Sequence, residues 1–328
     1  MKTSRGNRYD RDTDFRNLTV PCVRPPASWR AVSFPEGRAV WGQLAFWFRR
    51  IWPPLPVWKR LDLSILCVVA YTVVVELTFA YLPSRPPKWI GDVSVANAIL
   101  LGVLLAFRNK EAYERWWEAR KHWGRLINDS RNLMLKVVAL GNPPQESRAY
   151  LATLVAGFAI ALKNHLRGRK PLQVVPGFET AAESPTHVPM YVSKLVYSFL
   201  REWRECTVRP DVDYLAVDAH ARALMDVCGA CERIQTTPVP LSYRSLLRHG
   251  TVLYLLSAPW FMASEYGYWA VPIVALIAYF LLGTELTAED VEDPFGHDSD
   301  DLELNRYCEV IRKSCDELLG EPIGEPGA

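Results

Sequence analysis

The chain has 328 residues, of which 49% are hydrophobic, and it carries a formal net charge of +2. This balance gives no reason to expect nucleic-acid binding, which requires a clustered basic face. Charged residues are missing from a few long windows and dense between them, a pattern typical of proteins that share their residues between lipid and water. We therefore expect an all-α integral membrane protein with four transmembrane helices and a cytosolic helical bundle.

The N-terminal segment, residues 1–60, is rich in arginine and becomes aromatic towards its end. Residues 1–38 contain no apolar stretch, so we expect no cleavable signal and a first hydrophobic window that is retained. The aromatic part is interrupted by Pro53, Pro54 and Pro56, which favours a segment lying at the membrane interface over a further span. The Arg-rich part is expected in the cytosol.

The first transmembrane helix is predicted over residues 61–82, an apolar run of the right length that follows Lys59 and Arg60. Its one internal acidic side chain after the first turn is Glu76. A carboxylate that faces lipid is costly, so Glu76 should face a partner helix, a water-filled cavity or the outer interface.

The second transmembrane helix is predicted over residues 93–107, which is short for a span that faces lipid, at about 15 residues. Something other than lipid could therefore surround part of it. It runs directly into a basic stretch that begins at Arg108 and Lys110, which places that end on the cytoplasmic side. The intervening loop is expected outside.

Residues 108–245 are charged and helical in pattern, and we predict a cytosolic helical region there. Residues 149–162 are apolar but too short to span, which indicates a buried helix of this bundle. Cys228 and Cys231 form a CxxC motif without the second pair that a structural zinc site needs, so we interpret them as two small buried residues of a helix.

Two further transmembrane helices are predicted, over residues 246–263 and 269–286, joined by a short outer turn. Pro238 and Pro240 precede the third helix, where they could act as a hinge or simply start the helix. Residues 287–328 should form an acidic cytoplasmic tail. The lysine and arginine distribution thus predicts a multi-pass protein of the plasma (cell inner) membrane with both termini in the cytoplasm, folded as one intertwined domain.

One face of the second transmembrane helix stands out. Ile99, Val103 and Phe107 lie four residues apart and so share a helix face. Beside them a stripe of small residues, which lets membrane helices approach closely, is made of Ala98, Gly102 and Ala106. In an oligomer, the small residues could pack helix against helix while the bulky ones form an apolar neck that gates by dewetting. An ordinary buried helix would also produce this spacing.

Three runs resemble segments of the bestrophin family in its prokaryotic branch: FRNKEAYERWWEARKHWGRL at 107–126, CERIQTTPVPLSY at 231–243 and EDVEDPFG at 289–296. The similarity extends from about Leu61 to about Leu319. The resemblance implies a homopentamer with a central pore, a neck lined by the second transmembrane helix, and a wider cytosolic vestibule. The family's three neck rings fall on Ile99, Val103 and Phe107.

The resemblance also implies two other sites. The segment at 209–213 matches the cytosolic aperture of family members and would place Val212 there, although an incidental apolar residue at a helix start is the alternative. Asp298 and Asp301 fall on carboxylate positions of the calcium clasp of animal bestrophins, and carboxylates are the ligands that calcium prefers. His297 and Ser299 interrupt the acidic run here, so solvated negative charge is the other interpretation.

Taken together, these observations and the resemblance predict a passive ion channel that conducts chloride or a similar monovalent anion. A monovalent cation channel of the same fold and a non-conducting membrane scaffold are the alternatives. Motifs such as GxSxG, HExxH or a phosphate-binding loop are absent, so we do not expect an enzyme. The expected partners are further copies of the chain, membrane lipid and monovalent ions, with calcium as a candidate cofactor.

Overall fold

The computed structural model describes residues 56–81, 89–141, 143–168, 170–205 and 211–319. Within these ranges the chain is helical, with two short 3-10 turns and no strand, as expected for an all-α protein. The predictions for the Arg-rich N-terminus and most of the interfacial aromatic segment concern residues 1–55, which lie outside the described ranges. Residues 56–60 form the start of the first described helix.

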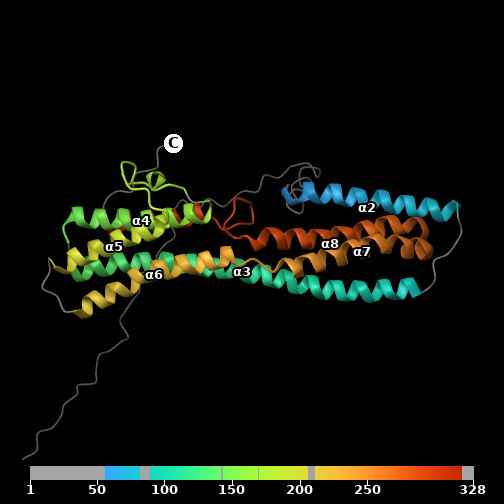
Figure 1. Cartoon of the computed structure of the whole chain (residues 1–328), viewed down its shortest axis with the longest axis horizontal. Coiled ribbons are helices and arrows are strands. Elements are labelled where there is room, and N and C mark those ends of the chain that lie inside the picture. The colour runs from blue at the N-terminus through green and yellow to red at the C-terminus, as the bar shows by residue number, and fades with distance from the viewer. Residues whose placement is uncertain (1–55, 82–88, 142, 169, 206–210, 320–328) are drawn as a thin grey trace, which may run out of the picture. The chain divides into compact units, whose positions relative to one another are not determined.

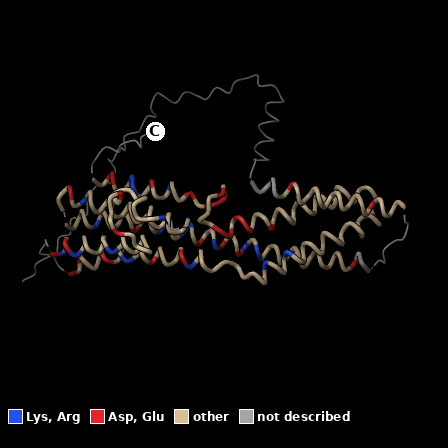
Figure 2. Tube along the Cα trace, turned by 45° about the horizontal axis from the view of Figure 1, so that its top comes forward, with Lys and Arg blue, Asp and Glu red and all other residues tan. Residues whose placement is uncertain are grey.

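Four helices with apolar, exposed surfaces form one half of the described chain. They are α2 (Pro56–Tyr81), the first part of α3 (Trp89–Gly141), α7 (Leu241–Tyr266) and α8 (Ala270–Glu292). Figure 1 shows α7 and α8 lying between α2 and α3, so these two helices form the centre of the group. Charged residues are sparse along this half and dense in the other half (Figure 2).

Among the described residues, four segments are long and apolar enough to cross a membrane: Leu61–Tyr81, Gly91–Gly141, Gln145–Leu166 and Leu241–Glu292. The last of these contains two helices, α7 and α8, which are joined by a 3-10 turn at Gly267–Trp269 and run back alongside each other. The segment Gln145–Leu166 is different, because 72% of its most apolar window is buried inside the protein. Its apolar surface contacts protein rather than lipid, as the sequence predicted.

The acidic side chain of α2 is turned towards the other helices. Glu76 is only 8% exposed, next to Val75 in the small apolar cluster that α2 forms with Ala263 and Ala270. Of the environments predicted for Glu76, the structure therefore shows a partner helix.

A single helix of 53 residues, α3, connects the two halves. The sequence predicted that the second span would end at residue 107 and that the basic stretch after it would form a separate region. In the structure the helix continues without a break through Arg108 to Gly141, and the bounds of the membrane-spanning part within it stay a prediction. No proline or helix-ending glycine lies between these residues, so the change from apolar to charged side chains alters the surroundings of the helix and not its backbone.

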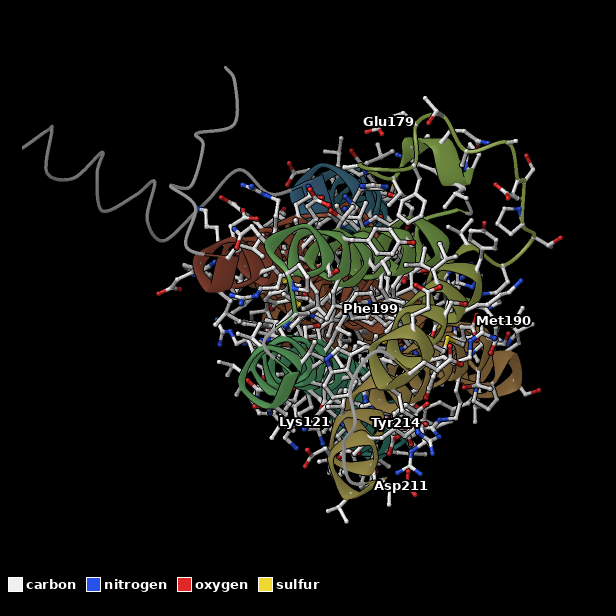
Figure 3. The ribbon with its side chains drawn as sticks, turned by 90° about the vertical axis from the view of Figure 1, so that its left-hand side faces the viewer. Lys121, Glu179, Met190, Phe199, Asp211 and Tyr214 are labelled. Atoms are coloured by element: carbon white, nitrogen blue, oxygen red, sulfur yellow. The ribbon has the colours of Figure 1, made fainter. Side chains whose placement is uncertain are left out.

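The second half of α3 packs with α4 (Gln145–Leu166), α5 (Val188–Glu205) and α6 (Asp211–Thr236) in a helical bundle. Viewed from the end of this bundle, Phe199 lies among the helices, whereas Lys121, Met190 and Asp211 lie at the periphery (Figure 3). The main core of the protein is here, and it includes fully buried Trp123.

A further helix, α9 (Leu304–Leu319), completes the bundle by packing against α3 and α4. The acidic tail predicted over residues 287–328 is therefore partly structured, since α8 extends to Glu292 and α9 follows. Its buried side chains recur at helical spacing: Leu304, Cys308, Ile311 and Cys315. This period was readable from the sequence and predicts a helix with one apolar face.

Candidate functional site

The first part of α3 has two faces with opposite surroundings. Leu101 and Leu105 are 2% and 4% exposed and pack in an apolar cluster with α7 and α8. On the other face, Ile99, Val103 and Phe107 are 65%, 50% and 56% exposed. Side chains three and four residues apart share one face of a helix, so these three form a continuous apolar surface that nothing in the described chain covers.

The small residues beside this surface differ in their exposure. Ala98 is half-buried against the cluster formed with α7, whereas Gly102 and Ala106 are exposed. A methyl group at Gly102 would have no heavy atom within 4 Å. The close approach that a glycine permits is therefore not used within this chain, and it remains available for a neighbouring helix.

Arg108 follows directly after the exposed apolar surface and points the opposite way. It is 1% exposed, donates from Nη2 to Glu292 Oε2 at 3.2 Å, and has its Nε 3.9 Å from Glu285 Oε1. Buried charges are costly unless they are paired, so this cluster ties α3 firmly to α8 just below Phe107. It was not predicted from the sequence, although two glutamates seven residues apart at the end of an apolar helix are a signal for a buried cationic partner.

Arg115 makes a second connection at the same level. Its guanidinium donates to the carbonyl oxygens of Ile234 at 2.6 Å and of Thr237, and its Nε donates to the carbonyl of Glu292 at 3.3 Å. The last carbonyls of a helix have no intrahelical donor, so Arg115 caps the C-terminus of α6. The same arginine thus fixes α6 and α8 against α3.

The turn between α6 and α7 is also attached to this cluster. The Val239 N–H donates to Glu292 Oε1 at 3.0 Å, and Pro240 is the N-cap residue of α7. Of the two roles considered for the prolines, the structure shows that Pro240 starts α7. A pocket of about 250 Å³ lies here, lined by residues that include Arg115, Arg244 and Glu289.

The residue predicted at the second constriction lies far along the chain from the α3 surface. Val212 is the second residue of α6 and is 70% exposed. Beside it, Arg204 binds Asp211 at 2.7 Å. The exposure of Val212 and the neighbouring ion pair fit both a cytosolic aperture and an incidental apolar residue at a helix start. The aperture at Val212 therefore stays a prediction.

The acidic turn after α8 is held together by its own carboxylate. Asp301 Oδ2 accepts a hydrogen bond from the backbone N–H of Asp298 at 2.6 Å. A Cβ at Gly296 would lie 2.6 Å from the same oxygen, so only glycine permits this approach. Burial raises the pKa of Asp301 to about 6. Calcium binding at Asp298 and Asp301 stays a prediction, and the Asp301 carboxylate also holds the turn through this hydrogen bond.

This raised pKa predicts a pH-dependent stability. The ordinary pKa of an aspartate is 3.8, so between about pH 4 and pH 6 the unfolded chain ionises Asp301 while the folded chain keeps its proton. Stability from this group is therefore highest below about pH 4, falls as the pH rises to about 6, and is constant above that. We expect Asp301→Asn to raise the thermal-unfolding midpoint at pH 7 but not at pH 4, with Asp300→Asn as the control. Equal midpoints for Asp301→Asn and the parent chain at pH 7 would contradict this.

Comparison with known proteins gives three results. The family model for bacterial and fungal bestrophin proteins matches residues 56–317. A "voltage-dependent anion channel-forming protein" of Nostoc sp. is 30% identical over 288 residues, which cover 85% of this chain and 91% of that protein. A protein of the same description from Mesorhizobium japonicum is 34% identical, covering 68% of this chain and 73% of its own length.

A solved structure supports the same family assignment. The crystal structure of a bacterial bestrophin homologue from Klebsiella pneumoniae superposes with a TM-score of 0.72 and 25% sequence identity, covering 80% of this chain and 99% of that one. The family match extends from the start of α2 almost to the end of α9, so it includes both halves of the fold and the exposed surface of α3. The chain is a membrane protein that belongs to the bestrophin family, in its bacterial and fungal branch.

Proposed function

We propose that this chain forms a homopentameric channel that conducts chloride and similar monovalent anions passively through a neck lined by Ile99, Val103 and Phe107. The observation that carries the proposal is the exposed apolar surface of α3, opposite a face that is packed against α7 and α8. Five copies around an axis would bring five such surfaces together. A short apolar neck of this kind loses its water when narrow and conducts when it is hydrated.

In this proposal the membrane-spanning parts are 61–82, 93–107, 246–263 and 269–286, and the bundle and both termini are cytoplasmic. The basic residues on the charged half of α3 support that orientation, since cytoplasmic segments carry an excess of lysine and arginine. Lipid would surround α2 and the outer surfaces of α7 and α8. The ion pairs of Arg108 would hold the base of each neck helix to its own subunit while the exposed face meets the axis.

The preference for anions is supported by the relatives, which are described as anion channel-forming proteins. The neck itself carries no fixed charge, so selectivity has to be measured. We expect currents from the purified protein in planar bilayers, with asymmetric potassium chloride, to reverse near the chloride equilibrium potential. Reversal near the potassium potential would replace the anion assignment with a cation channel of the same fold, and no current would favour a membrane scaffold.

Assembly provides a separate prediction. Because a Cβ at Gly102 would have no heavy atom within 4 Å in its own chain, Gly102→Leu should leave the subunit folded but block the close approach of neighbouring neck helices. We expect native mass measurements to show five subunits for the parent chain and a much smaller pentamer fraction for this variant. Ala70→Leu, at an exposed position of α2, is the matched control and should keep the parent distribution. An intact pentamer in Gly102→Leu would exclude ring packing through this stripe.

A further inference from the structure

Two histidines and a glutamate from three separate elements meet within the helical bundle. His165 is in the last turn of α4, His187 immediately precedes α5, and Glu232 is near the end of α6. Glu232 Oε1 lies 2.6 Å from His165 Nε2 and 2.9 Å from His187 Nε2, and the two imidazole rings lie 4.6 Å apart. The cluster lies away from the neck and has no role in the channel mechanism proposed above.

The surrounding contacts hold these three side chains in place. The side chain of His165 is only 8% exposed, while those of His187 and Glu232 are 27% and 33% exposed. Gln235 donates to the carbonyl oxygen of Leu166 at 2.5 Å and so ties the end of α6 to the end of α4. The arrangement is therefore a preformed, half-open site and not a chance encounter of mobile surface side chains.

The donor set is that of a transition-metal site. Imidazole nitrogen and carboxylate oxygen are common zinc ligands, and two histidines with one glutamate leave a fourth position for water. The three donor atoms lie within 4.8 Å of one another. With bond lengths of about 2.1 Å, tetrahedral ligands lie about 3.4 Å apart. A zinc ion would therefore require the Glu232–His165 separation of 2.6 Å and the Glu232–His187 separation of 2.9 Å to widen by about 0.8 Å and 0.5 Å. Among the described residues, the salt bridges of Glu232 are with these two histidines, so its negative charge is not already neutralised by a lysine or arginine.

Metal binding through His187 Nε2 requires a change of tautomer. His187 Nδ1 accepts a hydrogen bond from the backbone N–H of Met190 at 3.1 Å, so the proton of the neutral ring is on Nε2 and is donated to Glu232. Coordination through Nε2 moves that proton to Nδ1 and frees the Met190 N–H. Met190 is 56% exposed and lies at the periphery of the bundle (Figure 3), so water can replace the lost acceptor.

The nearby cysteines are not part of this donor set. Cys228 lies one helical turn before Glu232 and, like Cys231, is fully buried. The donor atoms close enough together to share a metal ion are those of His165, His187 and Glu232, and neither cysteine sulfur is among them. The CxxC motif therefore belongs to the core, as the sequence predicted, and the exposed side of the cluster leaves the fourth position to water.

We propose that His165, His187 and Glu232 form a binding site for zinc or a similar divalent transition metal that joins α4, α5 and α6. A metal that binds the folded chain and not the unfolded one stabilises the fold, so its effect should appear as a rise in the unfolding temperature. Without metal, the same residues remain a hydrogen-bonded cluster.

The test uses the full chain without a histidine tag, stripped with chelator, incubated with zinc chloride and freed of excess metal by gel filtration. We expect about one zinc per subunit and a rise of about 3 °C or more in the unfolding midpoint at saturating zinc. His187→Asn keeps a side chain that can accept the Met190 N–H but lacks the ligand nitrogen, and Glu232→Gln removes the charge. Both should lose the bound zinc and the temperature shift, while His122→Ala, which removes a histidine paired with one glutamate, should retain both.

Two results would overturn the proposal. One is a parent chain that holds no zinc after gel filtration. The other is a His187→Asn chain that folds with the parent's unfolding midpoint in the absence of metal and still binds as much zinc as the parent.

Discussion

Replacing Val103 with alanine should increase ion flux through the reconstituted protein by about tenfold, which corresponds to a barrier about 1.4 kcal/mol lower. Val103 is the middle member of the exposed α3 surface and is 50% exposed in the single chain. In a ring of subunits, the substitution would remove two methyl groups from each Val103 side chain of the proposed neck and ease hydration of the neck. Efflux of chloride from proteoliposomes measures the change directly.

The matched control for this experiment is Val252→Ala. Val252 is 49% exposed, lies in the apolar helix α7 and is outside the proposed neck. If the two valines had the same effect, the flux change would report general loosening of the membrane helices. Equal chloride flux through Val103→Ala and the parent chain would show that Val103 does not line the neck.

The second large effect is expected at Arg108. Removing one partner of a buried ion pair typically costs about 3–5 kcal/mol, because the remaining charge is buried without compensation. Arg108→Met would leave Glu285 without its cationic neighbour and Glu292 with its contacts to Arg244 and the Val239 N–H. We expect the thermal-unfolding midpoint in detergent to fall by about 6 °C or more.

Lys110→Met provides the comparison for Arg108. Lys110 is two residues further along α3, its side chain is 66% exposed, and it pairs with Glu114 at 3.6 Å. Exposed pairs contribute little to stability, so this variant should unfold within about 1 °C of the parent chain. A loss of stability no larger in Arg108→Met than in Lys110→Met would show that the buried cluster does not hold α3 to α8.

The parts of the fold that follow from local pattern were predictable from the sequence. The apolar run of α2, the buried α4 and the α7–α8 hairpin all have a distinctive hydrophobic period or length. The shared face of Ile99, Val103 and Phe107 also follows from helical spacing. The exposure of this face within the subunit does not follow from helical spacing. Spacing alone cannot distinguish a face that contacts another subunit from a face buried in the chain's own core.

The features that the sequence did not predict depend on contacts between distant residues. Arg108 and Glu292 are 184 positions apart, and His165 and Glu232 are 67 apart, so their pairing is created by the tertiary fold. The continuity of α3 was not predicted, for another reason. Its change in composition at Arg108 marks a change from apolar to charged surroundings, which resembles a helix boundary when only hydrophobicity is considered.

The most direct test of the proposed channel is chloride efflux from liposomes that contain the purified protein. A passive channel should dissipate an imposed chloride gradient without any added energy source, and liposomes without protein should retain it. We expect the gradient to collapse in proteoliposomes, and to collapse faster still with Val103→Ala. Retention of the gradient by both proteins, at the level of the protein-free liposomes, would contradict the channel.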